Sequence, residues 1–152
     1  MTDFIDFASL ERPKAPNHYL VAPEGLCQST TPDEDAPEFR DDPDAMFMNI
    51  VQMVRSKDNV QDIEVDESAR RLSFVSVTSF FKFKDDVDIA VLPGAAGSTV
   101  AIYSRSRVGK GDFGKNKKRV HGLIADLRKT RVLAEGEGGV TAKDPGIGAG
   151  KA

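Results

Sequence analysis

The spacing of apolar residues predicts a helix in DDPDAMFMNIVQMVRS (residues 41–56). Apolar side chains recur there at the three- and four-residue intervals that place them on one helical face: Met46, Phe47, Ile50, Met53 and Val54. Asp42 suits the N-cap position, and Pro43 suits the first helical position. Upstream, residues 16–39 form a proline-punctuated extended segment whose apolar residues we expect to anchor it across the core.

Runs rich in β-formers follow the helix. VQDIEV and RRLSFVSVT flank the polar turn DESA, and DDVDIAVL and STVAIYSRS flank PGAAG, so the sequence predicts two hairpins. In residues 86–91 valine or isoleucine alternates with Asp or Ala, which is typical of a strand with one face on the core. The intervening SFFKFKDD alternates Phe with Lys and also reads as a strand.

A second helix is predicted from about Gly114 to Arg131, with Asp112 as its N-cap. Its apolar stripe comprises Phe113, Val120, Leu123, Ile124 and Leu127. The order of elements favours the α+β class: an antiparallel sheet of four to five strands, formed by two hairpins, with two helices packed on one face. We expect a flexible lead-in at 1–15, a single domain at 16–132 and a glycine-rich flexible tail at 133–152.

The amino-acid composition limits the classes of protein to which the chain can belong. With 39% hydrophobic and 30% charged residues among 152, the chain is typical of one globular domain, and it has no apolar run long enough to span a bilayer. Its first residues resemble no secretory leader, so we expect a cytoplasmic protein. Cys27 is the only cysteine, which excludes an internal disulfide and a thiolate cluster, and the two histidines do not suggest a metal site. We expect no cofactor.

Charge is distributed unevenly along the chain. Ten Lys or Arg and two Asp lie between Arg105 and Arg131, so this segment carries +8 and the remainder −11 of the net −3. Seven acids and one arginine lie between Asp33 and Asp44, and these opposite poles are expected to meet within or between molecules. The basic helix offers no aromatic platforms for bases, which argues against nucleic acid. An acidic protein surface or peripheral contact with an anionic membrane fits the charge as well or better.

VGKGDFGKN (residues 108–116) has the G-x-G-x-x-G spacing of dinucleotide sites. Such a site needs a second parallel strand after the helix, carrying an acid for the ribose. Here only the glycine-rich tail follows, and the preceding strand belongs to an antiparallel hairpin, so we exclude this interpretation.

YSRSRVGKGDFGKNKKRV (residues 103–120) resembles the signature of the domain of unknown function 1499 (DUF1499) family of bacterial and plastid proteins. The matching positions are Ser104, Ser106, Arg107, Gly109, Asp112, Gly114, Asn116, Arg119 and Val120. FKDDVDI and PNHYLVAPEGL are similar to two further family segments. Tyr103 stands where many members have arginine, and Arg105 is additional, so we expect one cation to have moved to the other face of its strand. The resemblance implies a fold and a residue set but no established reaction.

The matched segments would bring a polar constellation together if the hairpins are neighbours. In one interpretation it is structural: Asp85, Asp86, Ser106 and Asp112 form a network that pairs the arginines and holds the turn into the helix. In the other, an anionic ligand is bound by Arg107, Lys110, Asn116 and Arg119. We expect a non-catalytic binding or assembly module for an anionic small ligand or an acidic protein partner. The alternative is a hydrolase or other enzyme acting on a small anionic substrate at Arg107, Asp112, Asn116 and Arg119.

Overall fold

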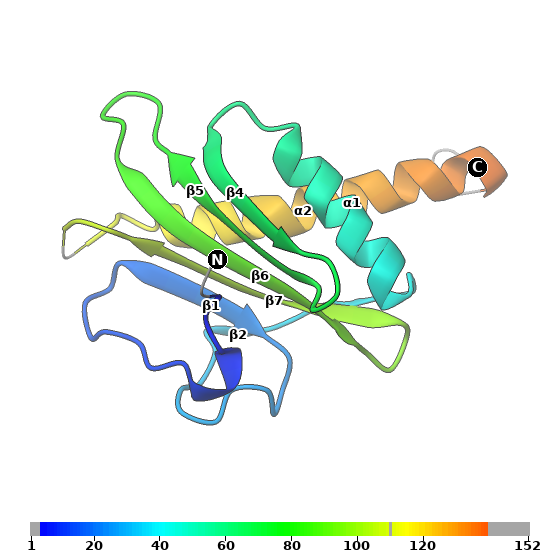
Figure 1. Ribbon diagram of the computed structural model, residues 1–152, viewed down its shortest axis with the longest axis horizontal. Coiled ribbons are helices and arrows are strands. Elements are labelled where there is room, and N and C mark those ends of the chain that lie inside the picture. The colour runs from blue at the N-terminus through cyan, green and yellow to red at the C-terminus, as the bar shows by residue number, and fades with distance from the viewer. Residues whose placement is uncertain (1–3, 110, 140–152) are drawn as a thin grey trace. The chain divides into compact units, whose positions relative to one another are not determined.

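The computed structural model describes residues 4–109 and 111–139 (Figure 1). Its elements in chain order are a 3₁₀ helix η1 (Phe7–Ser9), β1 (His18–Ala22), β2 (Glu34–Asp35), β3 (Glu38–Phe39), α1 (Pro43–Arg55), β4 (Val60–Asp66), β5 (Arg71–Val77), β6 (Lys84–Pro93), β7 (Ser98–Ser106) and α2 (Lys115–Gly139). The chain divides into two compact units at the Val120–His121 boundary, and the site described below lies within the first unit.

The strands form one seven-stranded sheet in the order β2-β1-β7-β6-β5-β4, with β3 also paired to β7. Every described pairing is antiparallel except that of β1 with β2. The α+β class is confirmed, and both predicted hairpins form. The strand count exceeds the predicted four to five, because the extended segment contributes β1, β2 and β3 instead of only lying across the core.

The two faces of the sheet carry different side chains, since residues on a strand alternate between faces. On one face of β6, Val87, Ile89 and Val91 are buried, as the alternation predicted. On the other face a cluster around Ala90 and Tyr103 is covered by the N-terminal segment, which contributes the following residues: Ile5, Phe7, Leu10, Leu26 and Cys27. The N-terminal segment therefore forms a layer on the face opposite to Val87 and Ile89.

Helix α1 forms as predicted. The Asp42 side chain accepts a hydrogen bond from the Ala45 backbone N–H at 2.9 Å, and Pro43 occupies the first turn. Its buried face consists of Met46, Phe47, Ile50, Val51 and Val54. This apolar face holds α1 against the sheet, where its contacts are with β4, β6 and β7.

Two apolar predictions are wrong. Phe113 was placed on the stripe of the last helix, but it precedes α2, has a φ of +53° and is fully exposed. SFFKFK was predicted to be a strand, but residues 79–83 form a turn between β5 and β6. A positive φ of +60° at Lys82 interrupts the extended backbone there, so the phenylalanines of this segment point into solvent.

Candidate functional site

A buried ion pair lies between β6 and the first turns of α2. Asp85 Oδ2 accepts a hydrogen bond from Arg119 Nη2 at 2.9 Å and lies 3.2 Å from Lys115 Nζ. Asp85 is 0% exposed, and the side chain of Arg119 is 15% exposed. The second carboxylate oxygen, Oδ1, is buried and has no hydrogen-bond partner among the described residues. Asp85 is therefore paired with two cations through one of its two carboxylate oxygens.

Asn116 links this ion pair to the rest of the motif. Its Nδ2 donates to the Asn17 carbonyl at 3.0 Å, to Ser106 Oγ at 3.0 Å and to Asp112 Oδ2 at 2.8 Å. Its Oδ1 accepts a hydrogen bond from Ser104 Oγ at 2.6 Å and is also bonded to the neighbouring arginine of α2. Asn116 is 0% exposed. The whole amide is thus used inside the protein.

Asp112 holds the backbone at the start of α2. Its Oδ1 accepts from the Gly114 N–H at 2.9 Å, and its Oδ2 accepts from the Asn116 N–H at 3.3 Å. Burial alone would raise the pKa of Asp112, but hydrogen bonds from the Asn116 side chain and from these two backbone groups, together with the charge of Lys115, lower it. The carboxylate stays ionised and satisfies N–H groups that an incoming anion would need.

Arg107 lies on the opposite face of the sheet. It makes a bidentate pair with Asp86, with both N–O distances at 2.9 Å. Asp85 and Asp86 are adjacent on β6, so they point to opposite faces and join different clusters. Lys110 lies outside the described residues. The four candidate ligand residues are therefore not gathered into one cradle within the described part of the chain.

The expectation that Arg105 lies on the other face of its strand from Tyr103 is wrong. Tyr103 and Arg105 are two residues apart on β7, so they share a face, and the Arg105 guanidinium lies 5.0 Å from the Tyr103 ring centroid. Arg105 Nη1 also lies 2.7 Å from Asp88 Oδ2. Arg105 therefore lies on the face that carries Tyr103 and Arg107.

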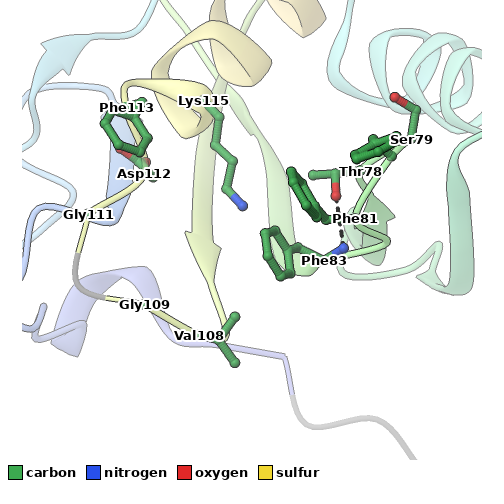
Figure 2. A pocket seen from close by; sticks show the side chains of 11 residues that line it. Thr78, Ser79, Phe81, Phe83, Val108, Gly109, Gly111, Asp112, Phe113 and Lys115 are labelled. Carbon is green, nitrogen blue, oxygen red and sulfur yellow. Dashed lines mark hydrogen bonds between the residues drawn. The ribbon is translucent and has the colours of Figure 1, made fainter.

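A pocket of about 440 Å³ lies between the β5–β6 turn and the β7–α2 loop, and sequence reasoning missed it (Figure 2). Its lining is mainly apolar and exposed, from Phe80, Phe81, Phe83, Val108 and Phe113. The polar lining side chains are those of Thr78, Ser79, Asp112 and Lys115. We call the five apolar residues the aromatic rim.

Hydrogen bonds from Thr78 fix one side of the pocket. The Thr78 N–H donates to the Phe83 carbonyl at 2.9 Å, and the Phe83 N–H donates to Thr78 Oγ1 at 2.8 Å. Phe81 stacks on Phe83 with centroids 5.4 Å apart, and Phe80 meets Phe81 edge-on at 4.8 Å. The turn therefore holds its rings in a defined arrangement while leaving them exposed.

Glycines shape the other side of the pocket. Gly109 and Gly114 have φ values of +87° and +78°, a region that side chains other than glycine rarely adopt. The Gly109 carbonyl accepts a hydrogen bond from Asn17 Nδ2 at 2.8 Å, which ties the loop to the segment before β1. The glycine spacing thus serves the path of this loop, which follows an antiparallel strand.

Lys115 connects the pocket to the buried ion pair. Its side chain points toward the rings of Phe81 and Phe83, and its Nζ lies 5.3 Å from the Phe83 centroid (Figure 2). The same amine is the one that lies 3.2 Å from Asp85. Lys115 therefore places a cation in a mainly apolar pocket.

Other reactive side chains are poorly placed for chemistry. Burial raises the pKa of the Cys27 thiol, against the opposing charge of Arg12, so the reactive thiolate is disfavoured. His18 hydrogen-bonds the Pro13 carbonyl at 2.9 Å. No group of three or more His, Cys, Asp or Glu residues that could hold a metal ion occurs among the described residues. No helix in the described ranges is apolar and long enough to cross a bilayer.

The fold and the Asp85–Asn116–Arg119 network define an α+β domain in which buried polar side chains hold the start of α2 against the sheet. Residues 11–127 match the family described as "Protein of unknown function (DUF1499)", which covers most of the chain, so the protein belongs to this family. No protein with a curated description matches the chain.

Proposed function

We propose that this domain is a non-catalytic binding module whose ligand is a small anionic amphiphile, with an apolar body and an acidic head group. The observation that supports this most directly is the pocket, in which exposed aromatic side chains surround the amine of Lys115. Ligand sites are typically apolar cavities with a few placed polar groups that fix orientation. The rim would contact the apolar body, and the amine would bind the head group.

Lys115 can bind an anion without leaving Asp85 unpaired. An ammonium group has three donors, and Asp85 Oδ2 also accepts a hydrogen bond from Arg119 at 2.9 Å. The arginine can therefore stabilise Asp85 while Lys115 bonds the head group of the ligand. Asp112, the acid among the described lining residues, already accepts hydrogen bonds from backbone N–H groups. Its carboxylate is therefore not expected to compete with the ligand for the Lys115 amine.

The contacts of Asn116 and Arg119, two of the residues that the sequence suggested as ligand-binding, favour a structural role over ligand binding. Asn116 is fully buried and bonded on both sides of its amide, and Arg119 has Asp85, Ser104 and Asn116 as partners. The enzyme alternative draws no positive support from these residues, since Asp112 is held ionised by hydrogen bonds and not poised to exchange a proton near neutral pH. An acidic protein partner would use the lysine but leave the aromatic lining without a role.

Thermal-shift titration tests this function. We expect dodecyl phosphate and dodecanoate, kept below their micelle concentrations, to raise the melting temperature, with dodecanol and inorganic phosphate each giving a much smaller shift. The neutral alcohol supplies only the apolar body, and inorganic phosphate supplies only the charge.

Lys115→Gln should weaken dodecyl phosphate binding about tenfold, because a hydrogen bond to a charged group contributes about 1.5–3 kcal/mol. Lys118→Gln is the matched control, since Lys118 is exposed on the same helix and does not line the pocket. Equal shifts with inorganic phosphate alone, or equal losses in the two variants, would contradict the proposal.

A further inference from the structure

The aromatic rim is the largest concentration of exposed apolar side chains among the described residues. Phe80 is 82% exposed, Phe81 68% and Phe113 104%. They come from two separate loops that line the same pocket. An exposed apolar patch of this kind marks a surface that is buried against something else during function.

The backbone holds these side chains outward. Phe113 has a φ of +53°, which is uncommon for a bulky residue, and it directly precedes Gly114 at the start of α2. On the other loop, Lys82 has a φ of +60°, and its N–H donates to the Thr78 carbonyl at 3.1 Å. Both loops therefore present their rings through local backbone geometry, and neither ring set is directed into the core of the sheet.

Cations are interleaved with the rings. Lys82 and Lys84 alternate with the phenylalanines of the β5–β6 turn and are exposed, and Lys115 lies inside the pocket. Among the described residues that line the pocket, Asp112 is the one acid, and its carboxylate accepts a hydrogen bond from the backbone of its own loop. The exposed rings of the rim therefore have positively charged side chains as close neighbours along the chain and in the pocket.

This combination fits a lipid bilayer better than a protein. Lysine is depleted at the buried centres of protein interfaces, whereas aromatic side chains flanked by lysines suit the boundary between head groups and acyl chains. Phenylalanine rings enter the apolar side of that boundary, and the long lysine stems keep their ammonium groups among anionic head groups.

We propose that the aromatic rim docks on the surface of an anionic lipid bilayer and that this bilayer is the source of the pocket's ligand. The inference rests on the proposed function, because it names where an anionic amphiphile would come from. Docking places the pocket mouth at the level of the lipid head groups, since the side chains that line it are also those that enter the bilayer.

Cosedimentation with vesicles tests docking. We expect the protein to bind vesicles of equal parts phosphatidylserine and phosphatidylcholine, to bind pure phosphatidylcholine far more weakly, and to lose binding as salt increases. Phe80→Ser should weaken binding about tenfold, and Lys82→Gln about fivefold. Both side chains are exposed, so neither change should disturb folding.

Matched controls lie at the other end of the sheet. Val65→Ser changes an exposed apolar side chain on β4, and Arg40→Gln changes an exposed cation beside Gly97 in the β6–β7 turn. Both should bind vesicles within about twofold of the parent protein, as is usual for surface changes outside a binding site. Equal losses in the controls and the rim variants would overturn docking.

The results distinguish docking from the proposed function. If no vesicles bind while dodecyl phosphate still raises the melting temperature, docking is wrong and the pocket proposal stands. If the protein binds anionic vesicles and Phe80→Ser weakens that binding, but no soluble amphiphile binds, docking is supported and the pocket proposal is wrong. If sedimentation equilibrium shows self-association that Phe80→Ser abolishes, and vesicles do not bind, the rim is a protein interface and docking is overturned.

Discussion

Replacing Arg119 with alanine should destabilise the protein strongly, because it removes the main partner of a buried carboxylate. Arg119 donates to Asp85 Oδ2 at 2.9 Å, to Ser104 Oγ at 3.1 Å and to Asn116 Oδ1 at 2.9 Å. The side chain of Asp85 is 1% exposed, and its Oδ1 already lacks a partner. Breaking a buried pair by removing one member costs about 3–5 kcal/mol.

The lower end of that range applies here, because Lys115 remains 3.2 Å from Asp85. We therefore expect Arg119→Ala to lower the free energy of unfolding by about 3 kcal/mol, a large share of the roughly 5–15 kcal/mol that a domain has in total. In urea this should move the midpoint down by about 1–2 M. Circular dichroism during urea titration at neutral pH measures it.

Arg107→Ala is the matched control. Arg107 and Asp86 have side chains that are 45% and 32% exposed, so water screens the pair and its loss should change stability by about 1 kcal/mol or less. The double variant Arg119→Met with Asp85→Leu should recover much of the lost stability, since no unpaired charge stays buried. Equal midpoints for Arg119→Ala and the parent, or equal losses for the two arginines, would refute this reasoning.

Three further predictions concern the start and the end of α2. The pKa of Asp112 is lowered in the folded protein, so its carboxylate stabilises the fold fully above the ordinary Asp pKa of about 3.9. This stabilisation is lost as pH falls through the folded pKa. The urea midpoint of the parent should therefore fall more steeply below about pH 4 than that of Asp112→Asn. Parallel curves would contradict it. Phe113→Ser should change the free energy of unfolding by about 0.5 kcal/mol or less, since the ring is fully exposed, and a loss above about 1 kcal/mol would show a missed contact. Truncation from Gly136 onward removes the last four residues of α2 and the residues that follow. It should leave the melting temperature unchanged in a thermal scan, because glycines make the end of a helix costly to order; a clear fall would disprove it.

The elements that could be predicted from the sequence are those whose signals are local. Helix α1 has a cap, a proline and apolar spacing within one short segment, and each hairpin has its turn between two strands. Strand β1 has no such local signal, because its partner is β7 and its pairing joins Leu20 to Tyr103. The prolines around β1 also suggested a surface segment, so the sheet was predicted with too few strands.

The sequence predicted which residues form the polar network, but not which of its ion pairs is buried. The sequence pointed to two arginines and two adjacent aspartates, and strand alternation separated Asp85 from Asp86. Which pair is buried depends on where the first residues of α2 pack, because Lys115 and Arg119 cover Asp85. The local sequence around Asp85 and Asp86 contains no signal for this packing. The aromatic rim was missed for a related reason. An alternation of Phe and Lys is typical of a strand, and nothing in the pattern signals the positive φ at Lys82 that turns the chain.

The pairing of β1 with β7 has a consequence for the order in which the protein folds during synthesis. β1 leaves the ribosome early, but its antiparallel partner is completed only after the β6–β7 hairpin has been made. Until then, Leu20 and Val21, which are 0% and 1% exposed in the finished protein, have only the two-residue strand β2 beside them. Contacts between distant parts of a chain form late and leave apolar strands open to aggregation. We infer that insertion of β1 beside β7 is a late folding step, and that the Asn116–Asn17 hydrogen bond forms with it.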